Sequence, residues 1–334
     1  ALPHACSGSS SDVAEAADPY RWLEVVNNTE TMNWVRGQNA RTLETVGDPT
    51  HSPLFPKILD LVQSKAKIPS VSVRGGHVYN LWQDEQHTRG IWRRTTLQAF
   101  RTSSPAWELV LDLDSLADAE GESWTWGGCI TLSLGPYEPE DLCLMKLSRG
   151  GADASVVREF NLTSQQFVPA PLGFTVPEAK TRVGYEGRDV VLIGADCGGG
   201  SFTNSGYPRT ARRWQRGTDL CSSPVVFEGV AGDVSVGQWR THDSRGYSYD
   251  WRSRATSFYD SEHLLRIVHR TPFIRLQVPT TAGVSTFADQ LVLTLRSDFA
   301  VSPSLTLRSG TIAATDAYAF LLGHRHNWTV LFEP

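Results

Sequence analysis

Hydrophobic and polar positions follow two different periodic patterns along this chain, and the pattern changes near Pro69. Between residues 18 and 67, apolar side chains recur three or four positions apart, which is the spacing of an α-helix. From residue 68 onward, short runs of Val, Ile, Leu, Trp and Tyr are broken by Gly, Pro, Asp and Asn, which predicts β-strands. Residues 1–17 are small and polar and are expected to be a disordered leader. The expected organisation is therefore a leader, a helical segment over 18–67 and an all-β region over 68–334.

The helical segment contains start and stop signals for two helices. Asn28 or Thr29 can cap the first helix, and Glu30 lies in its first turn. The Asp48-Pro49 pair ends that helix. A second helix is expected to open at Pro56, because proline is favoured in the first turn.

The all-β region contains an internal repeat. The stretches 71–84, 183–196 and 285–298 each read as a short strand, a tight turn, an apolar strand and an Asp. The three terminal Asp residues are 112 and 102 positions apart, twice a unit of about 50 residues, which suits one propeller blade. A second signature marks blade ends: WELVLDL at 107, PVVFEGV at 224, FIRLQVP at 273 and WTVLFEP at 328. These patterns predict an all-β fold, a β-propeller with about five four-stranded blades.

Composition and charge narrow the class of protein. The 334 residues are 40% hydrophobic and include 11 Trp, enough for a substantial core. The net charge is −5, and the one dense basic run, Arg209–Arg216, alternates like a strand, so no nucleic-acid partner is expected. No apolar run reaches the length of a membrane-spanning helix. The compartment stays open: the cytoplasm is favoured, with the periplasm or secretion as alternatives.

The spacing of the five cysteines argues against a metal site. None forms a CxxC pair, and no His pair lies at zinc spacing, so no metal and no cofactor is expected. Cys129 and Cys143 lie on two apolar runs separated by the turn-rich GPYEPED, and a hairpin could join them in a disulfide. Two reduced buried thiols are an equally open interpretation. Because five is odd, one thiol stays unpaired in any scheme.

The sequence lacks the motif of a serine hydrolase nucleophile. That motif is G-x-S-x-G between a strand and a helix. The nearest candidate, residues 199–203, lacks the closing Gly and has no helical pattern behind it, so Ser201 is expected to lie in a loop. The same loop has no Lys and therefore is not a phosphate-binding P-loop. No catalytic residue is predicted.

Other polar residues allow weaker hypotheses. Asp84, Asp196 and Asp298 occupy equivalent places in the repeat and could converge on a central funnel as the acid and base of a glycosidase. The competing interpretation, which we favour, is that each caps its own turn. His324 and His326 are expected in a solvent-facing loop. The acidic stretch 112–122 is interpreted as a solvated connection.

Several phrases in this chain resemble the prolyl oligopeptidase family of serine peptidases. They are DPYRWLE (18–24), WVRGQN (34–39), YNLWQD (79–84), GIWRRTT (90–96), LSRGGAD (147–153) and SGYPR (205–209). The resemblance implies a seven-bladed β-propeller joined to a C-terminal α/β-hydrolase domain that holds a Ser-Asp-His site. It also implies that the N-terminal helices pack on the hydrolase domain, and that the propeller admits only short, unstructured peptides to the site.

The chain departs from that pattern because the hydrolase domain and about two blades are not found in it. The first hypothesis is therefore a gating propeller that is inert alone, with the hydrolase domain and short peptides as partners. The second is a free-standing propeller that binds a peptide or protein. The third, less favoured, is the propeller glycosidase.

Overall fold

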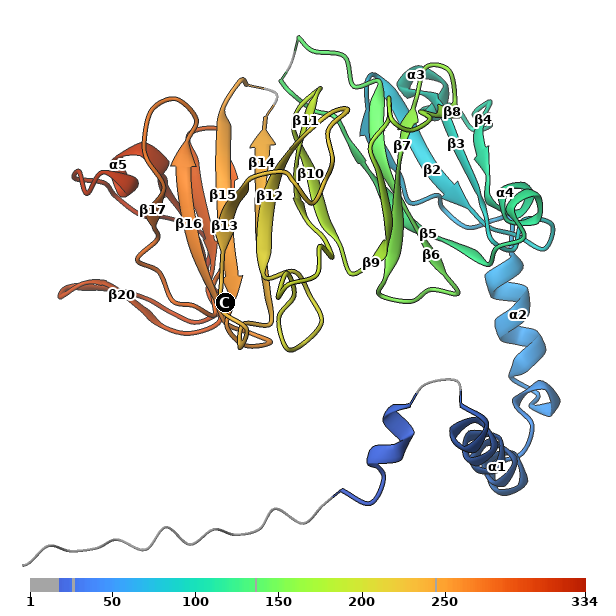
Figure 1. Cartoon of the computed structure of the whole chain (residues 1–334). Helices are drawn as coiled ribbons and strands as arrows, with labels where there is room; N and C mark the ends of the chain where they lie inside the picture. Colours follow the sequence, from blue (N-terminus) through green and yellow to red (C-terminus); the bar gives the residue numbers. More distant parts are fainter. Residues whose placement is uncertain (1–17, 26–27, 136, 244) are drawn as a thin grey trace, which may run out of the picture. The chain divides into compact units, whose positions relative to one another are not determined.

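The computed structural model describes residues 18–25, 28–135, 137–243 and 245–334. The expected disordered leader, 1–17, lies outside the described residues. The chain divides into two compact units, Ala1–Lys65 and Ala66–Pro334, whereas the sequence places the boundary between residues 67 and 68. Each unit is described by itself (Figure 1).

The first unit is helical, as its start and stop signals predict. The Asn28 side chain accepts a hydrogen bond of 2.7 Å from the Thr31 N–H and caps the first helix. Pro56 lies in the first turn of the second helix, where its missing N–H costs nothing. The elements are η1 (Arg21–Glu24), α1 (Thr29–Val46), η2 (Pro49–His51) and α2 (Phe55–Gln63).

The described part of the second unit contains five antiparallel sheets of four or five strands that follow one another along the chain, and a separate two-stranded hairpin (Figure 1). Blade 1 contains β1 (Ser72–Arg74), β2 (His77–Trp82), β3 (Ile91–Thr96) and β4 (Glu108–Asp112). Blade 2 contains β5 (Trp124–Thr131), β6 (Leu142–Arg149), β7 (Ser155–Asn161), β8 (Gln166–Phe167) and β9 (Thr175–Ala179), and both β8 and β9 pair with β7. Blade 3 contains β10 (Arg182–Gly187), β11 (Val190–Gly194), β12 (Thr210–Gln215) and β13 (Val225–Glu228).

The last two blades complete this series. Blade 4 contains β14 (Ser235–His242), β15 (Ser248–Ala255), β16 (Ser261–Ile267) and β17 (Ile274–Arg275). Blade 5 contains β18 (Gly283–Phe287), β19 (Gln290–Thr294), β22 (Ile312–Asp316) and β23 (Thr329–Phe332), with a hairpin of β20 (Phe299–Ser302) and β21 (Leu305–Leu307) inserted before β22. The predicted β-propeller architecture with five blades is confirmed.

The internal repeat has a direct structural meaning. Its three copies form the first two strands of blades 1, 3 and 5, which explains a spacing of two blades. The tight turn of the first copy is Gly75-Gly76, and both residues have positive φ (50° and 77°), a conformation that a two-residue hairpin requires and glycine supplies. The four blade-end signatures contain β4, β13, β17 and β23, each the last strand of its sheet.

Neighbouring blades bury apolar side chains between them. Blades 1 and 2 share a cluster that includes Trp92, Met145 and Phe160. Blades 2 and 3 share one with Phe174 and Trp214, and blades 4 and 5 share a third. One blade alone would leave these faces in water, so the hydrophobic effect drives the blades to stack.

The acidic stretch 112–122 is not the solvated connection that the sequence suggested. It contains the helix α4 (Leu113–Glu120), which the Asp112 side chain caps by accepting from the Ser115 N–H at 3.0 Å. Leu113 and Ala117, four positions apart, are 0% and 3% exposed and pack into the cluster between blades 1 and 2. The charged residues form the outer face of an amphipathic helix.

Two further short helices lie in the second unit. Residues 316–322 contain α5 (Ala317–Leu321), capped by Asp316, which accepts from the Ala319 N–H at 2.6 Å. The helix α3 (Leu97–Phe100) was not expected and connects β3 to β4.

Blade 4 contains a partly buried histidine, His263. The His263 ring lies edge-on to Trp251 at 6.3 Å between centroids, and its Nδ1 has no hydrogen-bond partner among the described residues. Burial lowers the pKa of His263. Because the unfolded-state pKa is about 6.5, the unfolded chain takes up the proton first as pH falls, so stability is lost below that pH.

We expect the variant His263→Gln to lose less stability than the parent between about pH 7 and about pH 5.5, the window in which the unfolded histidine becomes charged. Urea unfolding at both pH values measures the difference. His51→Gln, at an exposed position of η2, is the control and should keep the parent's full loss. An equal loss in His263→Gln and the parent would contradict the prediction.

Candidate functional site: the turn face of the propeller

Antiparallel order within each blade sorts the loops onto two edges. The turns between first and second strands, and those between third and fourth strands, lie at one edge, which we call the turn face. Its first-to-second turns are 75–76, 132–141, 188–189, 243–247 and 288–289. The helix α3 and strand β8 mark this edge at the top of Figure 1. The second-to-third turns lie at the opposite edge.

The three carboxylates singled out in the sequence lie at the opposite edge, each just after the second strand of its blade. Asp84 Oδ1 accepts hydrogen bonds of 3.0 Å from the Gln86 and His87 N–H groups, and Oδ2 accepts one from Trp82 Nε1 at 3.0 Å. Burial raises the pKa of Asp84, but the hydrogen bonds from Trp82 and His87 outweigh it and hold the pKa well below its usual range. Asp84 therefore stays charged and stabilises the turn that follows β2.

Asp196 and Asp298 also bond within their own blades. Asp196 Oδ1 accepts from the Gly198 N–H at 3.0 Å. Asp298 Oδ1 accepts from the Ser309 N–H at 2.8 Å, and this bond lowers the pKa of Asp298. Turn capping accounts for these contacts, while the glycosidase interpretation stays a prediction.

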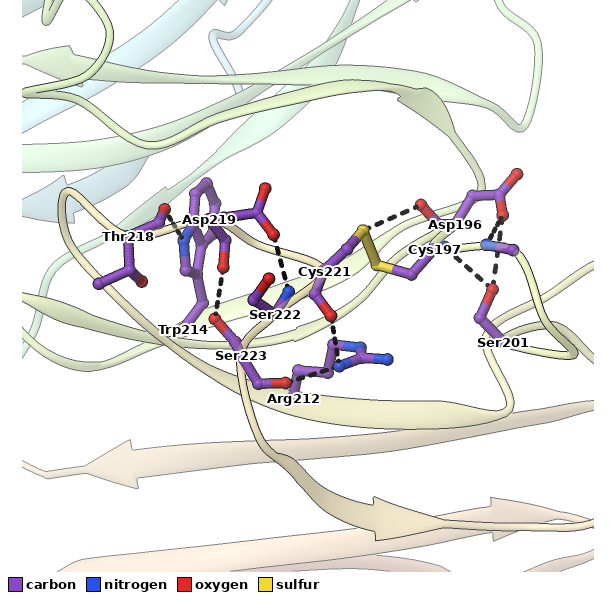
Figure 2. Close-up of a disulfide and its surroundings, with 11 residues drawn as sticks. Asp196, Cys197, Ser201, Arg212, Trp214, Thr218, Asp219, Cys221, Ser222 and Ser223 are labelled. Carbon is purple, nitrogen blue, oxygen red and sulfur yellow. Dashed lines mark hydrogen bonds between the residues drawn. A yellow bond between two sulfur atoms is a disulfide. The ribbon is translucent and has the colours of Figure 1, made fainter.

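Ser201 lies in the loop between β11 and β12 and is 5% exposed. Its Oγ accepts a hydrogen bond of 3.0 Å from the Cys197 N–H and lies 3.4 Å from Asp196 Oδ1 (Figure 2). The hydroxyl is thus used to close the glycine-rich loop.

Four of the five cysteines form disulfides. Cys129 in β5 is bonded to Cys143 in β6, across the hairpin of blade 2. Cys197 is bonded to Cys221, a pairing that the sequence analysis missed because the two lie in different loops of blade 3 (Figure 2). Arg212 braces the second bridge by donating to the Cys221 carbonyl at 3.0 Å. Cys6 lies outside the described residues.

A hollow on the turn face lies between the turns of blades 1, 2 and 4 and has a volume of about 660 Å³. Four carboxylates line it: Glu138, Glu140, Asp141 and Asp243. Three of them are engaged, because Glu140 Oε2 accepts from the Gly75 N–H at 2.5 Å, Asp141 pairs with Arg188 at 2.7 Å, and Asp243 Oδ1 accepts from the Arg245 and Tyr247 N–H groups at 2.8 and 3.0 Å. We call it the acidic hollow.

Blade 4 carries two smaller hollows on the same face. One, of about 190 Å³, is lined by Trp239, Tyr247, Tyr249 and Trp251, and we call it the aromatic hollow. The Trp239 and Trp251 rings stack at 6.0 Å with an interplanar angle of 3°. The other, of about 460 Å³, is lined by three arginines and two histidines, and we call it the basic hollow.

Buried carboxylates with arginine partners stabilise the blades that carry these hollows. Glu159 in β7 is 0% exposed; its Oε2 accepts from Arg216 Nη1 at 2.5 Å, and its Oε1 accepts from Tyr185 Oη at 2.8 Å. This joins blade 2 to blade 3. In blade 4, Asp250 is 0% exposed and accepts from Arg240 and Arg266. Sequence reasoning missed both groups, since the partners come from separate strands or, for Arg216, from the turn after β12.

Two negative findings concern the described part of the chain. There, no group of three or more His, Cys, Asp or Glu side chains could hold a metal ion, and His324 and His326 lie in the loop after α5. No helix among the described residues is both long and apolar enough to cross a bilayer.

The successive antiparallel sheets of four or five strands define the class of protein as a β-propeller, and comparison with known proteins identifies the family. Residues 9–179 match the model of the prolyl oligopeptidase N-terminal β-propeller domain. The chain belongs to the prolyl oligopeptidase family.

Two curated relatives are much longer than this chain. An uncharacterized peptidase of Sinorhizobium fredii is 33% identical over 330 residues, which are 96% of this chain and 44% of the relative. An uncharacterized peptidase of Rickettsia prowazekii is 22% identical and is covered over 42% of its length. The chain thus spans less than half the length of these relatives.

Solved structures show the same fold. A post-proline cleaving enzyme from Rickettsia typhi matches with a TM-score of 0.79 and 22% identity, covering 94% of this chain and 46% of that enzyme. Oligopeptidase B from Leishmania major matches with a TM-score of 0.58 and 12% identity, covering 95% of this chain and 49% of that chain. At these identities the likeness concerns the fold alone.

Proposed function

We propose that this chain is the propeller portion of a prolyl oligopeptidase-like serine peptidase and gates the access of peptides to a C-terminal α/β-hydrolase domain. The observation that carries this proposal is the match of residues 9–179 to the family's propeller domain in a chain that covers 44% of a relative named as a peptidase. On its own, the chain is catalytically inert.

The chemistry of the described residues supports inertness. The sequence contains no G-x-S-x-G motif, and Ser201, the nearest approach to one, is buried and bonded within its loop. A nucleophile needs an adjacent base and an exposed position on a strand-to-helix turn. The connection after β11 leads to β12 instead of a helix.

The first unit offers an apolar surface for a partner. The side chains of Ile58, Leu61 and Val62 in α2 are 57%, 73% and 63% exposed, and Trp34 in α1 is 38% exposed. Exposed apolar side chains on an amphipathic helix are typical of a docking surface. We propose that the hydrolase domain covers them, as the family resemblance implies.

Inertness can be tested with the purified chain. We expect no hydrolysis of prolyl or basic-residue peptide substrates above the buffer blank. The post-proline cleaving enzyme from Rickettsia typhi serves as the positive assay control for the prolyl substrates. Robust turnover that a serine-reactive phosphonate blocks would overturn the proposal.

Gating needs a second experiment. The chain is fused to the C-terminal portion of the S. fredii peptidase, the portion that this chain does not match. We expect the fusion to cleave a short peptide and to spare the same sequence placed in a loop of a folded protein. Cleavage of both substrates at similar rates would refute the gate.

A further inference from the structure

The basic hollow in blade 4 is built for an anion. It is formed by the turn between β14 and β15 and the turn between β16 and β17, and its lining includes Arg240, Arg245, Arg270, His242 and His269. Among the described residues that line it, none is Asp or Glu. This concentration of positive charge stands out in a chain whose net charge is −5.

Two of the three arginines are available to a ligand. Arg240 is committed, because it pairs with Asp250 at 2.6 Å and with Glu186 at 3.2 Å. Arg245 and Arg270 are exposed, and neither side chain makes an ion pair with another described residue. The Arg245 guanidinium lies over the Phe287 ring, at 5.1 Å from its centroid, and the Arg245 backbone N–H donates to Asp243 Oδ1 at 2.8 Å. Their guanidinium groups can therefore bind a carboxylate through charge-assisted hydrogen bonds.

The aromatic hollow adjoins the basic one. His242 and Tyr247 line both, so the two hollows share a wall. The walls of the aromatic hollow include the stacked Trp239 and Trp251, which suit an apolar side chain. Asp243 also lines the aromatic hollow, and its negative charge disfavours an anion there. Charge thus assigns the anion to one hollow and the apolar group to the other.

We propose that these two hollows together bind a peptide segment that carries a carboxylate beside an apolar side chain. The carboxylate lies against Arg245 and Arg270, and the apolar side chain enters the aromatic hollow. The inference rests on the proposed function, in which peptides are the molecules that reach the propeller. It adds a peptide recognition site to the gating propeller. The carboxylate can be a peptide C-terminus or an Asp or Glu side chain, since both present the same group.

Calorimetric titration of the whole chain with four acetylated peptides tests the proposal. The first, acetyl-Gly-Ala-Leu with a free C-terminus, is expected to bind. Its C-terminal amide lacks the carboxylate and should bind about tenfold more weakly or not at all. Acetyl-Gly-Ala-Gly with a free C-terminus lacks the apolar side chain and should also lose about tenfold. Acetyl-Asp-Leu-amide shows whether a side-chain carboxylate suffices.

Two double variants test whether Arg245 and Arg270 form the binding site. The double variant R245Q/R270Q removes both available arginines and should weaken binding of the free acid by at least about tenfold. The matched control R101Q/R296Q removes two exposed arginines that lie outside both hollows and should bind as the parent does. Equal thermal unfolding midpoints for the two double variants exclude misfolding as the cause.

Each outcome decides the matter. Binding of both free acid and Asp peptide, or of the free acid alone, supports the proposal and identifies the source of the carboxylate. Equal affinity for acid and amide, no binding of any peptide, or unchanged affinity in R245Q/R270Q would overturn it. These results leave the proposed function standing, because gating is measured separately by cleavage in the fusion.

Discussion

Replacing Glu159 by Ala is expected to lower the free energy of unfolding by about 3 kcal/mol. Glu159 is 0% exposed and accepts hydrogen bonds from Arg216 and Tyr185 in blade 3 and from the Phe174 N–H in blade 2. Without the carboxylate, the Arg216 guanidinium keeps only Asp189 as an anionic partner among the described residues, and the Tyr185 hydroxyl is left in an apolar cluster. Unpaired buried polar groups carry their full desolvation cost.

Urea unfolding, followed by circular dichroism, measures this loss. Glu228→Ala is the matched control: Glu228 also pairs with an arginine, Arg209, but its side chain is 52% exposed. Its removal should cost less than about 1 kcal/mol, because water screens exposed pairs. Equal effects of the two variants would show that the Glu159 group does not hold blades 2 and 3 together.

Replacing Trp251 by Ala is expected to cost about 3–5 kcal/mol, because it opens a large cavity between blades 4 and 5. Trp251 is 2% exposed, stacks on Trp239, and belongs to a cluster with Leu265 and Leu291. The same change removes one wall of the aromatic hollow. Thermal and urea unfolding measure the loss.

Tyr259→Ala provides the control for this change, since Tyr259 is an aromatic residue of the same blade that is 65% exposed. Its effect should stay within about 0.5 kcal/mol. A loss below about 1 kcal/mol for Trp251→Ala would mean that blades 4 and 5 do not depend on this contact.

Local signals predicted most of the fold. The Asn28 cap, the proline in the first turn of α2 and the short apolar runs of strands such as β11 act within a few residues, so the sequence shows them directly. Where the local signal was mixed, the prediction was wrong. The acids of 112–122 concealed the helix α4, because its apolar stripe consists of only a few side chains, Leu113 and Ala117 among them.

The candidate site could not be predicted in the same way. The basic hollow combines two turns that lie more than twenty positions apart, and the acidic hollow combines turns from three blades. Glu159 and Arg216 are 57 positions apart, and no local signal in the sequence indicates that they pair. Sequence reasoning instead selected Asp84, Asp196 and Asp298, whose repetition is visible but whose contacts are those of turns.

The sequence by itself determined the order of helices and strands and the repeat of about 50 residues, because each depends on neighbours along the chain. The stacked blades follow from that repeat. Only the tertiary structure decided which charges meet across blades, which cysteines pair in blade 3 and where the turn face is hollow. These features depend on distances between side chains from separate loops, which are fixed when apolar blade faces pack against one another.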